Sequence, residues 1–311
     1  MGAVASIFTR PSCYDMLPQT DPTCAALPAF LSGNRLGLNT ATGERVALVL
    51  RTQGLEVVYE ETSSPKTRKQ GPHNGVIPFL QILSATVTDS GFLSLAALYE
   101  RVAGAGPLFL WRLEADVSAV AVEQLAGWIQ ELLDKAYQGQ GYPQITSMIN
   151  GLISIWLITG VKPNRRFLVL VNPHGGRGKA QQIWDNIVEP IFNAAGSQAV
   201  LLHTGPSNTP TNARTLAQNL DLQLYDALVP ISGDGITSEL LNGLATRSDA
   251  LLALQTPISP IPGGSGNALS VNIMGPVRVL DPGFAALNAI KARVMSIKGS
   301  WCGLDRVDLN A

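Results

Sequence analysis

The 311-residue chain has few charged residues, few cysteines and few histidines. Charged residues make up 14% of the chain, the net charge is −1 and no run of Lys and Arg occurs, which argues against a nucleic acid partner. The three cysteines and three histidines lack the spacing of metal ligands, so no zinc cluster is expected and a reducing, intracellular compartment is the simplest interpretation. The first residues have neither the basic segment nor the long apolar run of a secretory signal.

Hydrophobic residues, by contrast, make up 46% of the chain, which is enough to build packed cores. The length suffices for about two domains of ordinary size. A weakly charged, slightly apolar composition also fits a protein that works near lipid.

The first segment, residues 1–35, is rich in Pro, Thr and small residues and is predicted to be a mobile leader. Gly2 after the initial Met, with Ser6 at the required offset, matches the pattern for N-myristoylation. Cys13 could carry a second acyl chain, because a single one anchors a protein only marginally. An unmodified terminus is the competing interpretation, since such short patterns often arise by chance.

Residues 36–140 are predicted to form a small α+β domain. Strand-like runs are expected at 46–50, 55–59, 77–83 and 108–113. A helix is expected at 120–137, because its apolar residues recur three and four positions apart. Short strands closed by one helix that carries Trp128 resemble, in pattern, a pleckstrin-homology-type module. A small α+β domain without a ligand of its own is the alternative.

Residues 141–165 are predicted to be a linker, although the segment 145–160 is apolar and almost uncharged. That segment is short and rich in Thr, Ser and Asn for a membrane span. It is either an interfacial or partly buried helix, or a segment that is not native to the protein.

From residue 166 the sequence alternates between strand and helix, which predicts a doubly wound, mostly parallel α/β sheet. Strands are expected at 167–171, 200–202, 227–231 and 258–261, and helices at 180–195, 211–220, 236–245 and 284–290. Three glycine-rich turns end strands and open helices, at 172–179, 232–235 and 262–267. Ligands bind beyond the carboxyl ends of such strands, where these turns are expected to converge.

A glycine-rich turn that opens a helix offers free backbone N–H groups and the positive end of the helix dipole to phosphate. Arg177 and Lys179 could help to neutralise a triphosphate. Neither the Walker spacing nor the dinucleotide fingerprint is present. Asp234, between two glycines, is expected to take up the proton of an acceptor hydroxyl or to hold Mg²⁺. A role only as a helix N-cap is the structural alternative.

The motifs NPHGGRGKA, SGDGITSELLNGL and PGGSGNALS resemble those of the diacylglycerol-kinase-type catalytic domain, in its sphingosine (long-chain-base) kinase branch. The resemblance covers residues 166–311, and the serine before GDG favours the sphingoid-base branch. It implies an ATP- and Mg²⁺-dependent lipid kinase that phosphorylates the primary hydroxyl of a sphingoid base, in the cytoplasm and peripherally attached to membranes. Ceramide, diacylglycerol or NAD kinase activity remain alternatives, as does a truncated, non-catalytic membrane-associated fragment.

The same resemblance implies roles for individual residues. Asp234 would be the catalytic base, with substrate contacts at Ser232, Gly233 and Gly235, and the metal ligands stay undefined. ATP contacts are expected at Asn172, His174, Gly175, Gly176, Gly178, Lys179, Thr204, Glu239, Gly264, Ser265 and Gly266.

The chain departs from the family pattern in several places. After Thr204 it has GPSNTPTNA instead of a charged stretch, Gly263 replaces the usual alanine, and Pro230 interrupts an otherwise apolar strand. It stops at Ala311, about where a β-rich substrate domain should begin, so we expect weak nucleotide binding and slow turnover.

Overall fold

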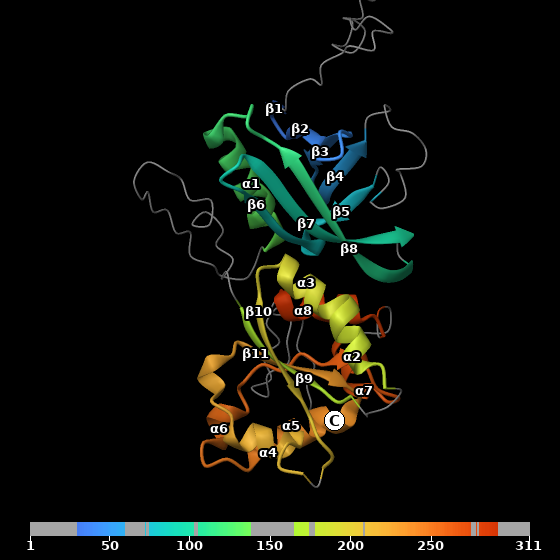
Figure 1. Cartoon of the computed structure of the whole chain (residues 1–311), viewed down its shortest axis with the longest axis vertical. Coiled ribbons are helices and arrows are strands. Elements are labelled where there is room, and N and C mark those ends of the chain that lie inside the picture. Colours follow the sequence, from blue (N-terminus) through green and yellow to red (C-terminus); the bar gives the residue numbers. More distant parts are fainter. Residues whose placement is uncertain are drawn as a thin grey trace, which may run out of the picture.

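The computed structural model describes residues 30–59, 72, 75–102, 105–137, 165–173, 178–207, 209–274, 278 and 280–291, which form one antiparallel and one parallel sheet with their helices (Figure 1). The predictions for residues 1–29, 145–160 and 292–311, including acylation at Gly2 and Cys13, lie outside these residues. So do His174, Gly175, Gly176 and Arg177. Within the described ranges, no helix combines the length and apolar character that a membrane crossing requires.

The first sheet is antiparallel, in the order β5-β4-β3-β2-β8-β7-β6, with β1 paired to β2. Its strands are β1 (Phe30–Ser32), β2 (Arg35–Thr40), β3 (Arg45–Leu50), β4 (Gly54–Tyr59), β5 (Val76–Pro78), β6 (Ile82–Val87), β7 (Phe92–Val102) and β8 (Ala105–Asp116). The helix α1 (Val122–Ala136) packs on it through Leu125, Ile129 and Leu132, which recur at helical spacing and join the same hydrophobic cluster as the strands.

The strands differ from the prediction in four places. The run 77–83 is not one strand. The strand β5 ends at Pro78, and the 3₁₀ turn η1 (Phe79–Gln81) separates it from β6. Both β2 and β7 are absent from the prediction. The sheet also begins at Phe30, inside the segment 1–35 that was expected to be a mobile leader. An antiparallel sheet followed by one helix agrees with a small α+β unit, and its likeness to a pleckstrin-homology module stays a prediction.

The second sheet is parallel, in the order β10-β9-β11-β12. Its strands are β9 (Arg166–Val171), β10 (Gln198–His203), β11 (Ala227–Ser232) and β12 (Ile261–Pro262). Along β9, Phe167 and Val169 belong to one hydrophobic cluster and Leu168 and Leu170 to another, because successive side chains of a strand point to opposite faces. Both faces of this sheet are therefore buried, in agreement with the α/β prediction.

Helices cover each face of the parallel sheet. The Phe167 face carries α2 (Ala180–Ile183), the π-helical turn η3 (Trp184–Val188), α3 (Glu189–Ala194) and α8 (Pro282–Ile290). The opposite face carries α4 (Ala213–Asn219), α5 (Asp234–Ala245) and α6 (Ala250–Ala253), and Leu222 of η4 (Leu222–Leu224) packs there too. Met274 of α7 (Ala268–Met274) packs against the cluster of the Phe167 face. The widened turn η3 ends at Val188, two residues before Pro190, which has no N–H to donate to a helical hydrogen bond.

Pro230 is tolerated in β11 although it cannot donate to a ladder. Leu228 N donates to Pro257 O and Leu228 O accepts from Ser259 N, so this edge of β11 faces the segment before β12. Pairing with β12 begins only at Ile231, opposite Ile261. The missing donor of Pro230, two residues after Leu228, therefore falls where the ladder is already interrupted.

The two sheets are joined through α8, which lies between them in Figure 1. Leu83, Leu98 and Leu108 of the antiparallel sheet belong to the same hydrophobic cluster as Phe167 of the parallel sheet and the buried residues of α8. This hydrophobic cluster thus contains residues of both sheets. Whether each sheet is a separate domain, with the predicted boundary near 141–165, stays a prediction.

Polar contacts also cross this junction. Lys291, which is 1% exposed, donates from Nζ to Ile82 O at 2.6 Å and to Ala136 O at 3.1 Å. Asp281 Oδ2 accepts from Leu108 N at 3.0 Å. A buried lysine ammonium that binds backbone carbonyls of the antiparallel unit fixes the end of α8 against it.

Candidate active site

A pocket lies beyond the carboxyl ends of β9, β11 and β12. In the sheet, β9 lies between β10 and β11, so the chain continues from β9 to one side and later returns to the other. This is the switch point at which open α/β sheets bind their ligands. The pocket has a volume of about 370 Å³. It is lined by Asn172, Ala180, Ser232, Gly233, Asp234, Gly235, Ile236, Glu239, Gly263, Gly264, Ser265 and Gly266.

Two of the glycine-rich turns pack on each other, backbone to backbone. A Cβ on Gly233 would lie 2.6 Å from Gly266 O, a distance that real Cβ atoms essentially never show. Asp234 N donates to Gly266 O at 3.1 Å and Gly263 N donates to Ser232 O at 3.1 Å. The side chain of Asn267 bonds to Gly264 N and Gly264 O and so closes the second turn. Glycine is required here because the two backbones leave no room for a side chain.

Asp234 is the first residue of α5, and its carboxylate is bound to a different helix. Its Oδ2 accepts from Ala268 N at 2.9 Å and its Oδ1 accepts from Leu269 N at 3.0 Å. These are the first two amides of α7, whose N-terminus is thereby capped by a residue from the other turn. Each carboxylate oxygen has about two acceptor sites, so both can still accept a further hydrogen bond.

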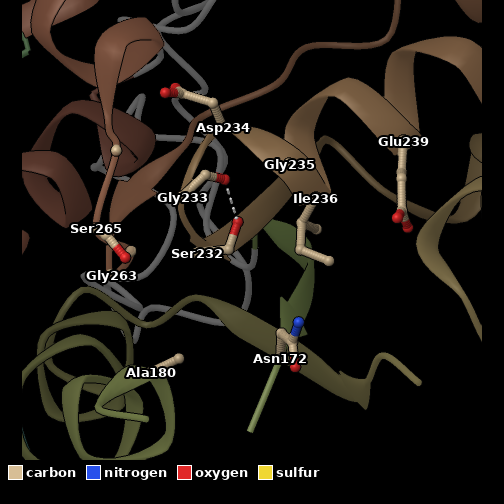
Figure 2. A pocket seen from close by; sticks show the side chains of 12 residues that line it. Asn172, Ala180, Ser232, Gly233, Asp234, Gly235, Ile236, Glu239, Gly263 and Ser265 are labelled. Atoms are coloured by element: carbon tan, nitrogen blue, oxygen red, sulfur yellow. Dashed lines mark hydrogen bonds between the residues drawn. The ribbon is translucent and has the colours of Figure 1, made fainter. Parts of the chain in front are cut away.

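Glu239, further along α5, has a different environment. Figure 2 shows the carboxylates of Asp234 and Glu239 pointing in different directions from α5. Glu239 Oε1 accepts from Ser207 Oγ at 2.5 Å, whereas Oε2 is buried and has no hydrogen-bond partner in the described part of the chain. A buried carboxylate oxygen without a donor is costly, so Glu239 Oε2 is a candidate acceptor for a ligand.

The structure brings most of the predicted site residues together. The pocket lining includes Asn172, Ser232, Gly233, Asp234, Gly235, Glu239, Gly264, Ser265 and Gly266. Thr204, Gly178 and Lys179 do not line it, and Thr204 is buried, with its N and Oγ1 both donating to Val171 O. The roles of these residues stay predictions.

Three lining residues were not predicted. Ala180 is the first residue of α2, after the first glycine-rich turn, and Ile236 is the third residue of α5, after the second. Gly263 lies inside the third turn. Their positions directly beside the turns are the signal that could have identified them. Among the lining residues there are two carboxylates and no Lys or Arg, and no group of three potential metal ligands occurs among the described residues.

Residues 166–299 match the family model of the diacylglycerol kinase catalytic domain. Over 137 residues the chain is 42% identical to sphingoid long chain base kinase 4 of Schizosaccharomyces pombe, which covers 44% of this chain and 29% of that protein. It is 32% identical over 269 residues to sphingosine kinase 2 of Homo sapiens, covering 82% of this chain and 38% of that protein. A solved diacylglycerol kinase structure from Bacillus anthracis has 25% sequence identity and a TM-score of 0.32, and the match covers 42% of this chain and 43% of that one.

The chain thus spans well under half of the length of these two curated relatives. Both matches are with proteins named for the phosphorylation of sphingoid bases, and the family model covers the segment that contains all three glycine-rich turns. Through residues 166–299, the chain therefore belongs to the diacylglycerol kinase catalytic domain family, as a member of the sphingosine kinase type.

Proposed function

We propose that the chain is an ATP-dependent lipid kinase that transfers the γ-phosphoryl group to the primary hydroxyl of a sphingoid long-chain base. The observation that carries this proposal is the packing of the Ser232–Gly235 turn against the Gly263–Gly266 turn around one pocket, with Asp234 in its wall. The names of the curated relatives support the sphingoid acceptor class. Such acceptors reside in membranes, so the enzyme would work at the cytoplasmic face of a membrane.

The residues of the pocket fit a nucleotide. The twelve-residue helix α5 begins at the pocket, and a Cβ on Gly235 would meet no heavy atom within 4 Å, so this side of the turn is open to a ligand. The amides at the start of α5 and the Gly264–Gly266 turn would hold the phosphates. Mg²⁺, when bound, neutralises charge that develops on the transferred group. Its ligands would be mainly phosphate oxygens and water, since no cluster of three potential metal ligands exists among the described residues.

In the transfer step, Asp234 would accept the proton of the acceptor hydroxyl. The bonds from Ala268 N and Leu269 N hold both of its oxygens, so the carboxylate is oriented before the acceptor arrives. Ser232, whose Oγ donates to Gly233 O at 2.7 Å, retains its oxygen lone pairs for a hydroxyl of the substrate. Phosphoryl transfer depends mainly on positioning and charge, and this arrangement supplies positioning.

The proposal is tested with an acceptor panel. The full chain, in molar excess over ATP labelled in its γ-phosphate, is incubated with Mg²⁺ and with sphingosine, dihydrosphingosine, ceramide or diacylglycerol in mixed micelles. We expect label on the two sphingoid bases. Label only on ceramide or diacylglycerol would overturn the acceptor class, and no labelled lipid from a folded chain would overturn the kinase assignment.

A further inference from the structure

Ser207, in the loop after β10, contacts the pocket residue Glu239. Ser207 Oγ donates to Glu239 Oε1 at 2.5 Å, across a separation of 32 positions in the sequence. The other oxygen of Glu239 is the buried side-chain atom without a partner among the described residues. The bond from Ser207 therefore fixes the orientation of the Glu239 carboxylate, so that one oxygen is bonded within the protein and the other can accept from a ligand.

The loop itself holds Ser207 in place. Asn212, which is 8% exposed, donates from Nδ2 to Ser207 O at 2.9 Å and to Thr209 O at 2.6 Å. Its Oδ1 accepts from Thr215 N and caps α4. Thr209 Oγ1 donates to Pro206 O at 2.7 Å. The backbone on both sides of Ser207 is thus fixed to the start of a helix, and the hydroxyl is oriented before any ligand binds.

The loop is also electrically neutral. Residues 204–212, TGPSNTPTN, contain no charged side chain. No Lys or Arg is bonded to Glu239 in the described part of the chain, and its observed partner is a neutral hydroxyl. The Glu239 side chain therefore needs a hydrogen-bond donor from the pocket rather than an anion.

The chemistry of a nucleoside triphosphate restricts what this donor can be. Phosphate oxygens only accept at neutral pH and are repelled by a carboxylate, so the donors are the sugar hydroxyls and the amino group of the base. Glu239 lies four residues beyond Gly235 on α5, which corresponds to about 6 Å along the helix axis. The sugar, which is bonded directly to the phosphates, matches so short a distance better than the distal amino group of the base.

We propose that Ser207 is a positioning residue that orients Glu239 so that Oε2 accepts a hydrogen bond from a ribose hydroxyl of the nucleotide. The inference rests on the proposed function, because it assigns the sugar end of the same nucleotide site. It makes the chain selective for ribonucleotides, through a serine that lies in the segment where the chain departs from the charged pattern of its family.

The test is calorimetric titration of the full chain with Mg²⁺ complexes of ATP, 2′-deoxy-ATP, 3′-deoxy-ATP and inosine triphosphate. Wild type is expected to bind ATP about tenfold more tightly than at least one deoxy analogue. This difference in affinity corresponds to the loss of one hydrogen bond to a charged group. Inosine triphosphate, which lacks the amino group, should bind like ATP. If instead inosine triphosphate loses affinity and both deoxy analogues do not, the donor is the base and the proposal fails.

Variants separate positioning from folding. Ser207→Ala should weaken ATP binding by about three- to tenfold and bring the affinities of ATP and the deoxy analogue together, whereas Ser207→Thr, which keeps a hydroxyl, should restore the difference. Ser238→Ala, on the neighbouring exposed position of α5, should change neither value. A Ser207→Ala protein with wild-type discrimination would overturn the role of Ser207 while leaving the kinase assignment intact. If wild type binds no nucleotide at all, the proposed function and this inference both fall.

Discussion

Gly233 and Gly264 are in direct backbone contact: a Cβ on Gly264 would lie 2.3 Å from Gly233 Cα and 2.4 Å from Gly233 N. Neither residue has the left-handed backbone conformation that usually explains a glycine. The need for glycine arises from the close approach of two turns that come from different strands. The shape of the pocket wall therefore depends on the absence of two side chains.

Gly264→Ala should be strongly destabilising, because neither backbone can move away without breaking the Asp234 N to Gly266 O bond. We expect a loss of about 3 kcal/mol in the free energy of unfolding and loss of nucleotide binding. Gly263→Ala in the same turn is the matched control, since its Cβ would lie 3.3 Å from Ile231 Cγ2 and Ser232 N and needs only a small adjustment. Urea unfolding measures the free energy of unfolding of both variants. Equal stabilities of the two variants would contradict the backbone contact between Gly233 and Gly264.

The junction between the two sheets makes a second prediction. Lys291→Met removes the ammonium that binds Ile82 O and Ala136 O and should cost about 2 kcal/mol, because buried carbonyls lose their donor. Since one hydrophobic cluster spans both sheets, wild type should unfold in a single transition seen equally by circular dichroism and tryptophan fluorescence. Lys135→Met, which removes a lysine paired with Glu131 on the surface of α1, should change stability little. Two separate transitions would show that the sheets are independent.

The parallel sheet could largely be predicted from the sequence, because its strands contain apolar runs and glycine-rich turns follow β9, β11 and β12. The sequence predicts a strand at 167–171 and a helix at 236–245, and the structure has Arg166–Val171 and Asp234–Ala245. The strand β7 could not be predicted from its local sequence, because Ala96 and Ala97 are weak strand formers. Their conformation is set by pairing with β6 on one side and β8 on the other, which no local pattern reveals.

The site shows the same division. Motifs indicate which turns converge, but the bond between Asp234 and the start of α7 depends on how two turns meet in space. The Ser207 contact with Glu239 likewise joins distant segments. Lys291 could not be predicted as a buried junction residue, because lysine is almost never fully buried unless its charge is bound.

Arg247 ties the end of α4 to the turn after α5, and its partner Asp249 makes this contact sensitive to pH. Arg247 Nη1 donates to the carbonyls of Ala217, Gln218 and Leu220, while Nε and Nη2 bind Asp249. The hydrogen bond from Arg247 lowers the pKa of Asp249 below its ordinary value of 3.8. A lowered pKa in the folded state stabilises the fold above the ordinary value, and this contribution is lost as the pH falls through the folded pKa.

Thermal melting from pH 7 to pH 2.5 tests this contact. The melting temperature of wild type should exceed that of Asp249→Asn at neutral pH, and the difference should narrow as acid protonates Asp249. Because Asp249 is exposed to solvent, the effect should be small. Asp185→Asn, on the opposite face of the sheet, serves as a control for the loss of one carboxylate. A difference that stays constant down to pH 2.5 would exclude Asp249 as the titrating group.

The most direct measurement compares phosphate transfer and ATP binding in wild type and Asp234→Asn. The asparagine side chain can still accept one amide of α7, so ATP affinity should stay within about threefold of wild type. Single-turnover transfer from ATP to sphingosine should fall by about 10²- to 10⁴-fold, because no carboxylate remains to take the proton. An Asp234→Asn protein that binds ATP normally and transfers phosphate at close to the wild-type rate would contradict a catalytic role for Asp234 and leave it only the capping of α7.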